Sequence, residues 1–498
     1  MTRVLTLALL AVLALAAPAS AASRDRDRDR DVMRAYASDT WRSFELMVDP
    51  YTGLPSDNVS ASGERARYTS PTNIGTYLWS TIAARDLGLI RDHQAYTRMA
   101  RTLNSVAKLE RHEASGQFYN WYDPRNGQKL TTWPANGDPV HPFLSSVDNG
   151  WLGAALLMVQ RAEPDLRAEA RAIERKMNWG FYYNPSEGQL RGGAWVEPPP
   201  GCSVPTQYED EEVYMTCHHY GALNTEPRIT SYLGIADGSV PPEHYFRMFR
   251  TLPASCDWGW HEMQPEGVTR TYRGVDVFEG HYTYRGMDLV PSWGGSMFEA
   301  LMVPLLVPEE QWGPRSWGVN HPLHVRAQQE HGLEEAGYGY WGFSPSNNPD
   351  GGYREYGVDP IGQEPNGYTS DQERTTVDYG FGDCRPAKPE PTSYGRGVVT
   401  PHASFLALDF DRRGSLENLA RLKRDFGVYG SGGFYDAVDV KTGTVSRFYL
   451  ALDQGMVMAA LANELGDDRL QRYLSPALEP SVRPLLAMEQ FTAGGGGR

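Results

Sequence analysis

Two kinds of segment alternate along this chain. Segments of the first kind place Arg and Glu on one face of a helical pattern and Leu, Ala, Met or Phe on the other. These amphipathic segments are 33–47, 93–112, 165–177, 242–252, 322–335 and 415–426. Each is followed by a segment with apolar or small residues on nearly every side: 72–87, 147–159, 225–236, 293–306, 401–408 and 449–465. A helix that is apolar all round is a buried helix, so the pattern predicts exposed helices that alternate with buried ones.

This alternation is typical of an (α/α)6 barrel, in which an outer ring of helices encloses an inner ring. An α-solenoid is the alternative, but the irregular spacing of the buried segments and the long insertions between them favour a closed barrel. We therefore predict an all-α (α/α)6 toroid with β-hairpin and long aromatic loop insertions at the cleft. It is expected to form one domain over residues 33–480, followed by a tail, 481–498.

The connections between the segments carry aromatic residues and turns. Three of them open on Phe118, Phe181 and Phe434, and continue into Gly-containing turns at 125–127, 186–188 and 441–443. Each predicts a short β-hairpin. The longest insertion, 337–396, is rich in Gly, Pro, Tyr, Asn and Asp. A loop of that length in a compact domain is usually functional or disordered, and its aromatic content favours an ordered, functional loop.

The amino terminus predicts export. Residues 1–21 combine Arg3, an apolar run and the small-residue site Ala19-Ser20-Ala21, which is the pattern of a signal peptide. The strict Arg-Asp alternation that follows predicts a disordered charged leader over 22–32. No other stretch is apolar and long enough to span a bilayer. We expect a secreted or periplasmic protein.

Four cysteines in an exported chain suggest disulfides, for which three connectivities exist. Cys202 and Cys217 lie in one loop, so we favour that pair, which leaves Cys256 with Cys384. Metal binding is the weaker interpretation, because no two of the four form a C-x-x-C pair.

Charge and composition narrow the function. The net charge is −15 and no basic run occurs beyond the amino terminus, which argues against nucleic-acid binding. The 13 Trp and 28 Tyr are side chains that stack on sugar faces, although they also serve ordinary packing. We expect no cofactor, no metal, no membrane or nucleic-acid partner, and a monomer.

The starts of the buried segments carry polar and aromatic residues. If the inner helices run parallel, these starts meet at one mouth, where a polar ligand would bind. Each Asp, Asn or Thr among them is also an ordinary helix cap, but Trp151 and Trp293 are not cap residues. The sequence therefore predicts a ligand site at that mouth.

Glycoside cleavage without a cofactor requires two carboxyl groups, one as acid and one as base or nucleophile. The carboxylates available are Asp148, Glu226, Glu279, Glu299, Asp436 and Asp453. Thr225 is expected to cap a helix that has Pro227 in its first turn, so Glu226 would lie at the helix mouth. The helix dipole lowers a pKa there, so an acid role requires burial or a neighbouring carboxylate. The alternative is that Glu226 only helps to cap the helix. Motifs of other chemistries, such as G-x-S-x-G, H-E-x-x-H and G-x-x-x-x-G-K-[ST], are absent from the sequence.

Several motifs resemble one known family. They are Thr69-Ser70-Pro71-Thr72-Asn73, Ser146-Val147-Asp148-Asn149-Gly150-Trp151, Asn224-Thr225-Glu226, Ser292-Trp293-Gly294-Gly295-Ser296, Gly433-Phe434-Tyr435-Asp436 and Leu452-Asp453-Gln454-Gly455. The chain resembles the glucoamylase-like family, which includes bacterial endo-β-1,2-glucanases and the processing domain of cyclic β-1,2-glucan synthases. The insertion around 353–374 departs from that pattern.

The resemblance implies an (α/α)6 fold and hydrolysis of glucan, best supported for β-1,2-glucan cut in endo fashion. It implies Glu226 and Asp436 as the catalytic carboxylates, with Asp148 in the cleft. Residues expected to bind substrate are Asn224, Trp151, Trp293, Glu299, Trp341, Tyr435 and Asp453. The alternatives are a glycosidase of another linkage on the same scaffold and a non-catalytic carbohydrate-binding protein.

Overall fold

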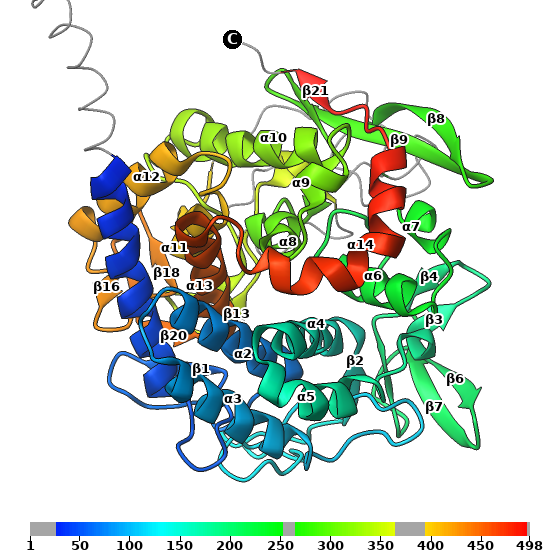
Figure 1. Ribbon diagram of the computed structural model, residues 1–498. Helices are drawn as coiled ribbons and strands as arrows, with labels where there is room; N and C mark the ends of the chain where they lie inside the picture. The colour runs from blue at the N-terminus through cyan, green and yellow to red at the C-terminus, as the bar shows by residue number, and fades with distance from the viewer. Residues whose placement is uncertain (1–25, 252–263, 364–393, 496–498) are drawn as a thin grey trace, which may run out of the picture.

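The computed structural model describes residues 26–251, 264–363 and 394–495, and helices dominate it (Figure 1). Residues 26–47 form the first helix. The longer helices that follow are α2 (Pro71–Asp86), α3 (Asp92–Val106), α4 (Ser146–Ala162), α6 (Arg228–Asp237), α10 (Trp317–Glu330), α12 (Arg412–Asp425), α13 (Ala451–Gly466) and α14 (Gln471–Met488). The shorter ones are α5 (Arg167–Glu174), α7 (His244–Arg247), α8 (Met297–Leu301), α9 (Glu309–Trp312) and α11 (Pro401–Leu406).

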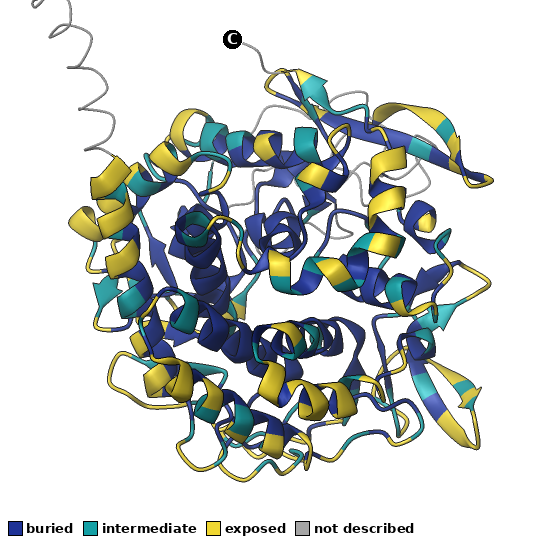
Figure 2. Ribbon diagram, viewed as in Figure 1, coloured by how far each residue is buried: buried dark blue, intermediate teal, exposed yellow. Residues whose placement is uncertain are grey.

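The buried helices contact one another in a series. Helix α2 packs between α13 and α4, α4 also contacts α6, and α11 contacts both α13 and α8. Nearly every residue of α2 is buried, whereas the neighbouring α3 buries only the apolar stripe that includes Met99, Leu103 and Val106. Figure 2 shows the same division, with buried helices inside and exposed faces turned outward. The predicted helical fold is therefore confirmed.

Two glycines allow these inner helices to approach closely. A Cβ on Gly75 would lie 2.9 Å from the carbonyl oxygen of Trp151, and one on Gly455 would lie 2.5 Å from Cβ of Thr76. Because no side chain fits at either position, α2 packs directly against α4 on one side and against α13 on the other.

The carboxyl-terminal part of the chain differs from the prediction. Helix α14 extends to Met488, and it packs against α4, α6 and α9. Val482 and Leu485 on it are buried, so a tail that begins at residue 481 is wrong. Pro476, Pro480 and Pro484 interrupt this helix, and proline is a poor predictor of helix in a sequence. In the described part of segment 242–252, where an outer helix was expected, residues 242–251 contain only the four-residue helix α7.

The structure of the charged leader also differs from the prediction. Residues 26–32, which the Arg-Asp alternation predicts to be disordered, are helical and continue into the buried face that begins at Met33. Arg30 Nη2 donates to the carbonyl oxygen of Leu465, 3.2 Å away. The helix packs against the rest of the molecule, and this packing keeps the charged residues 26–32 helical as well.

The insertions form small sheets. One has the order β2 (Phe143–Ser145), β5 (Gly193–Trp195), β7 (Glu211–Thr216), β6 (Ser203–Tyr208), and another the order β21 (Gly494–Gly495), β10 (Met287–Leu289), β9 (Val275–Tyr284), β8 (Glu266–Tyr272). Short pairs are β1 (Asn58–Ser60) with β20 (Phe448–Leu450), β11 (Ser292–Trp293) with β14 (Gly362–Gln363), β12 (Ser346–Asn347) with β13 (Tyr353–Arg354), and β16 (Tyr429–Gly430) with β17 (Gly433–Phe434). Strand β15 (Val398–Val399) pairs with β18 (Ala437–Asp439).

Two of the three predicted hairpins are regular. Strand β3 (Tyr183–Asn184) pairs with β4 (Gln189–Leu190), and β18 (Ala437–Asp439) pairs with β19 (Val445–Ser446). After Phe118 the chain instead makes isolated bridges, although the predicted turn forms, with Gly127 N donating to Asp123 O at 2.8 Å.

Cys202 and Cys217 form the predicted disulfide, which joins the open ends of the β6–β7 hairpin. The expected Cys256–Cys384 pair and the signal peptide lie outside the described residues. Among the helices that the structure describes, none is long and apolar enough to cross a membrane.

Candidate active site

A cavity of about 920 Å³ lies where the starts of several helices meet. Its lining includes Thr72 and Asn73 of α2, Val147 and Asp148 of α4, Phe298 and Glu299 of α8, and Leu452 of α13. Glu226, two residues before α6, also lines it. The wall is completed by strands β1 and β20, loop residues 121–136 and insertion residues 345–355. The structure thus brings the predicted carboxylates Asp148, Glu226 and Glu299 into one cavity.

The local structure at Glu226 differs from the expected helix cap. Helix α6 begins at Arg228, Pro227 occupies the cap position, and no side chain caps the helix. The Thr225 hydroxyl instead donates to Glu299 Oε2 at 2.5 Å, so its predicted role as the cap is wrong. Glu226 therefore lies before the first turn, and its carboxylate accepts a hydrogen bond from Trp151 Nε1, 2.5 Å from Oε2.

Glu226 has the environment of a proton donor. Burial raises its pKa well above the ordinary value for glutamate, and the charges of Glu299 and Asp148 act in the same direction. The hydrogen bond from Trp151 and the charge of Arg228 lower this pKa but do not reverse the shift. The side chain is nevertheless half-buried and open to the cavity. Burial and a neighbouring carboxylate, which an acid at this position requires, are both present.

Glu299 is the closest electrostatic neighbour of Glu226. Its Oε2 accepts from the Thr225 hydroxyl and from the Glu226 backbone N–H, 2.9 Å away. Burial raises the pKa of Glu299 to about 7, against the lowering effect of these hydrogen bonds. Both carboxyl groups have raised pKa values, so the pair retains a proton near neutral pH.

Asp148 is held by two side chains. Thr72 Oγ1 donates to Oδ1 at 2.7 Å, and Asn120 Nδ2 donates to Oδ2 at 2.9 Å. Asp148 lies in the first turn of α4, which Ser145 caps, and it is partly exposed to the cavity. A carboxyl group can accept more than two hydrogen bonds, so Asp148 retains acceptor capacity towards the cavity.

Two cavity carboxylates were not among the predicted site residues. Asp57 accepts from Asn73 Nδ2 and from Asn58 Nδ2, both at 2.9 Å, and burial raises its pKa. Glu355 enters the cavity from the long insertion. Neither belongs to a segment with helical periodicity, so their sequence context gives no signal beyond the aromatic character of the insertion.

Asp436 and Asp453 lie behind the cavity wall. Both are buried, and Asp436 Oδ2 accepts from the backbone N–H of Asn347 at 2.5 Å, while Asn347 itself lines the cavity. Burial raises the pKa of Asp436 to about 6. The pKa of Asp453 lies well above its ordinary value, because this residue is buried and lies beside the charge of Asp436. The two carboxyl groups therefore titrate as a coupled pair that retains a proton above the usual range for aspartate.

His402 completes this buried group. Its Nδ1 lies 3.4 Å from Asp453 Oδ2, and burial lowers its pKa to about 3, so the ring is neutral. One ring nitrogen and two carboxylate oxygens lie within 4.8 Å of one another, a donor set that suits a divalent cation as well as a shared proton. The expectation that the protein contains no metal stays a prediction.

The other residues predicted to bind substrate do not line the cavity. Asn224 and Trp151 are buried, and Asn224 Nδ2 donates to Val290 O at 3.1 Å. Trp293 is partly exposed elsewhere, in strand β11. Trp341 and Tyr435 are buried, with the Tyr435 ring 4.9 Å from that of Tyr449. The prediction that these side chains line a substrate site is therefore not met by this cavity.

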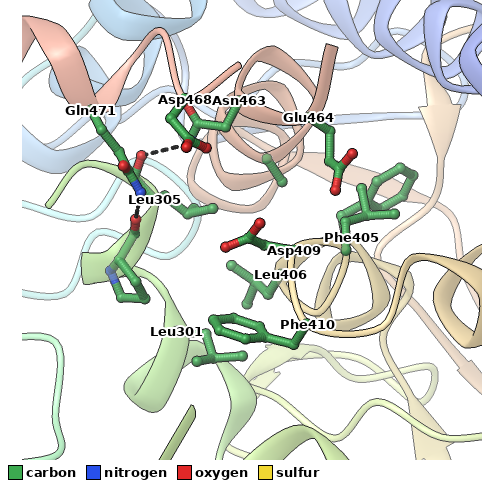
Figure 3. Close-up of a pocket in the computed structure, with 13 residues that line it drawn as sticks. Leu301, Leu305, Phe405, Leu406, Asp409, Phe410, Asn463, Glu464, Asp468 and Gln471 are labelled. Carbon is green, nitrogen blue, oxygen red and sulfur yellow. Dashed lines mark hydrogen bonds between the residues drawn. The ribbon is translucent and has the colours of Figure 1, made fainter. Parts of the chain in front are cut away.

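A second, smaller pocket lies near the carboxyl-terminal ends of α8, α11 and α13 (Figure 3). Apolar side chains such as Leu301 and Phe410 face the carboxylates of Asp409, Glu464 and Asp468 across it. Its volume of about 30 Å³ matches one water molecule, so it cannot accept a sugar.

Two family models match the chain, each over a different part of it. Residues 233–475 match the family described as "putative glucoamylase". The resemblance to the glucoamylase-like family is confirmed. Residues 35–214 match a second model, described as a protein of unknown function (DUF3131).

One curated relative is the cyclic β-(1,2)-glucan synthase NdvB of Rhizobium meliloti (strain 1021), which is 24% identical over 589 residues. The match covers 90% of this chain but 18% of the synthase, so the chain spans less than a fifth of that relative.

Solved structures share the fold. A putative glucoamylase from Bacteroides uniformis superposes with a TM-score of 0.64 at 16% identity, over 92% of this chain and 97% of that one. The endo-β-1,2-glucanase from Chitinophaga pinensis, in complex with sophorotriose and glucose, gives 0.61 at 16%, over 92% and 98%. The endo-β-1,2-glucanase from Talaromyces funiculosus, a mutant in complex with β-1,2-glucan, gives 0.63 at 13%, over 92% and 88%. At these identities the likeness demonstrates the fold alone.

Proposed function

We propose that this protein is an exported glycoside hydrolase that cuts β-1,2-linked glucan within the chain. The observation that carries the proposal is Glu226, a carboxyl group with a strongly raised pKa that opens into a large cavity containing further carboxylates. The volume of about 920 Å³ suits an oligosaccharide segment. Relatives of the same fold are named endo-β-1,2-glucanases, which supports this linkage and endo action.

The scaffold that we propose is an (α/α)6 barrel with a signal peptide before it. The contacts that run from α8 through α11, α13, α2 and α4 to α6 support a ring of inner helices. The Cys202–Cys217 disulfide supports export to an oxidising compartment. Mass spectrometry of the protein from the periplasm or medium tests cleavage after Ala21; an uncleaved cytoplasmic protein would contradict export.

The charge of the cavity supports a neutral substrate. Its lining contains the acidic residues Asp57, Asp148, Glu226, Glu299 and Glu355, and among the lining residues that the structure describes none is Lys or Arg. Ionised carboxylates repel an anionic ligand, because both are negatively charged. An unsubstituted glucan therefore fits better than a polyuronide.

In the proposed mechanism Glu226 protonates the glycosidic oxygen as the bond breaks. A second carboxylate activates water. The family resemblance implies Asp436 as the other catalytic carboxylate, and we propose the role of base for Asp436. Its pKa of about 6 leaves it ionised at neutral pH, and the Asn347 backbone that holds it is part of the cavity wall. Asp148 is the second candidate, because it faces the cavity directly.

Release of reducing ends from linear β-1,2-glucan, with laminarin, starch and cellulose in parallel, tests the activity and the linkage. Glu226→Gln should lose about 10²–10⁴-fold in kcat, the usual contribution of a general acid. Glu243→Gln is the control, because Glu243 forms an exposed ion pair with Arg273 away from the cavity. Full activity of Glu226→Gln would refute the assignment. Binding of glucan without cleavage by the wild type would favour the carbohydrate-binding alternative.

Asp436→Asn and Asp148→Asn separate the two candidates for the base. We expect the larger loss of kcat, on the order of 10²–10⁴-fold, in Asp436→Asn. If Asp148→Asn shows that loss and Asp436→Asn stays within about tenfold, water activation belongs to Asp148 instead.

A further inference from the structure

Three aromatic side chains of the cavity wall pack on one another instead of on the core. The Tyr68 ring lies 5.5 Å from those of both Trp121 and Trp133, edge-on at 85° in each case, and the two indoles are 5.7 Å apart. All three side chains are partly exposed and line the cavity. None belongs to the main hydrophobic core or packs against it. Folding alone therefore does not explain why large apolar rings are kept at this surface.

The backbone holds these rings in place. Thr69 and Tyr122 exchange two hydrogen bonds, at 2.9 and 3.0 Å, in an antiparallel bridge. Tyr68 and Trp121 flank this bridge as diagonal neighbours, so their side chains share one face. Trp133 closes a tight loop: its N–H donates to Asp138 O and its carbonyl accepts from Gly137 N, both at 2.8 Å. Rings fixed in this way lose little conformational freedom when a ligand binds, so the surface is pre-organised.

Hydrogen bonds connect the aromatic cluster to the carboxylates. Asn58 Nδ2 donates to Asp57 Oδ2 at 2.9 Å and approaches the Tyr68 hydroxyl at 3.4 Å. Asn136, in the same loop as Trp133, adds a polar side chain to the cavity lining. Apolar ring faces beside amide and hydroxyl groups match a ligand that has C–H faces and a rim of hydroxyl groups, which is the chemistry of a pyranose.

We propose that Tyr68, Trp121 and Trp133 form a stacking subsite, on the Asp57 side of the cavity, that binds a glucosyl unit away from the scissile bond. The subsite rests on the proposed glucanase function and extends it. A unit held there adds binding energy only for chains long enough to reach it. The subsite therefore makes cleavage efficiency depend on chain length and favours cutting within a chain over trimming of its ends.

The test measures kcat/KM for a size series of β-1,2-gluco-oligosaccharides. Trp133→Leu keeps an apolar side chain but removes the aromatic face, whereas Trp133→Phe keeps an aromatic face. We expect Trp133→Leu to lose roughly tenfold in kcat/KM for long oligosaccharides, mostly through KM, as for an anchoring Trp in an interface. The shortest cleaved oligosaccharide should change by less than about twofold, and Trp133→Phe should retain most of the wild-type value. Tyr51→Ala is the control, because Tyr51 is 88% exposed and outside the cavity.

The outcomes separate the subsite from the proposed function. If the wild type cleaves β-1,2-glucan and Trp133→Leu keeps its profile of kcat/KM against chain length, the subsite is refuted and the function stands. A uniform loss at every chain length would also refute it. Calorimetric titration of Glu226→Gln with long and short oligosaccharides, with and without Trp133→Leu, repeats the comparison on binding alone. If the wild type neither binds nor cleaves any glucan, the proposed function itself fails.

Discussion

The hydrogen bond from Trp151 to Glu226 allows the protonation of the proposed acid to be changed without touching its carboxyl group. Trp151 is completely buried, and its Nε1 lies 2.5 Å from Glu226 Oε2. A donor favours the ionised carboxylate, so this bond lowers the pKa that burial raises. Trp151→Phe removes the donor and keeps an aromatic ring. The pKa of Glu226 should therefore rise further.

The magnitude follows from the strength of such a bond. A hydrogen bond to a charged group contributes roughly 1.5–3 kcal/mol, and about 1.4 kcal/mol corresponds to one pH unit. Glu226 is half-buried, so water replaces part of the lost bond. We expect a rise of about one pH unit. An acid must be protonated to act, so the alkaline limb of the kcat/KM profile should move to higher pH by that amount.

Trp79→Phe is a matched control. Trp79 is also buried, its ring lies 5.9 Å from that of Trp151, and its Nε1 donates to Gly455 O at 2.9 Å instead of to a carboxylate. Both variants should lose roughly 1–3 kcal/mol of stability through the smaller ring. Only Trp151→Phe should move the alkaline limb. An unchanged limb in Trp151→Phe, or an equal movement in both variants, would refute Glu226 as the acid.

Three further variants test charge and stability. Asp57→Asn removes a charge that raises the pKa values of the buried aspartates behind the cavity wall, so the acidic limb of kcat/KM should move down by roughly half a pH unit. Arg250→Leu leaves the buried carboxylate of Glu489 without its ion-pair partner and should cost about 3–5 kcal/mol in the free energy of unfolding, measured with urea. Cys202→Ser with Cys217→Ser opens a 15-residue loop and should cost up to about 3 kcal/mol, measured in the same way.

Each of these three predictions has an outcome that would contradict it. Asp57→Glu keeps the charge and should leave the acidic limb in place; a shift equal to that of Asp57→Asn would exclude charge as the cause. Arg273→Leu breaks an exposed ion pair and should change stability by less than about 1 kcal/mol. If Arg273→Leu lowers the free energy of unfolding as much as Arg250→Leu does, burial does not explain the cost of Arg250→Leu. Equal stability of the wild type and the double cysteine variant would show that the disulfide contributes nothing.

The sequence by itself determined the helical fold and much of the candidate site. Helix α2 is buried on all sides, whereas α3 is buried on one side only. The spacing of apolar residues in the sequence predicts this difference, because the side chains on one face of a helix recur every 3.6 residues. The Cys202–Cys217 pair was predictable because both residues lie in one loop. Asp148 and Glu226 were identifiable because they stand at the starts of buried segments.

Only the tertiary structure decided what those residues meet. Glu226 owes its raised pKa to burial and to Glu299, whose carboxylate comes from 73 residues further along the chain. Asp57 enters the cavity from a segment without helical periodicity, whereas Tyr435 and Trp341 are hidden behind the wall. Desolvation and Coulomb interactions depend on distance in space, which no local pattern records. The sequence could therefore name some of the carboxylates, but only the fold could show which one remains protonated and which ones face the cavity.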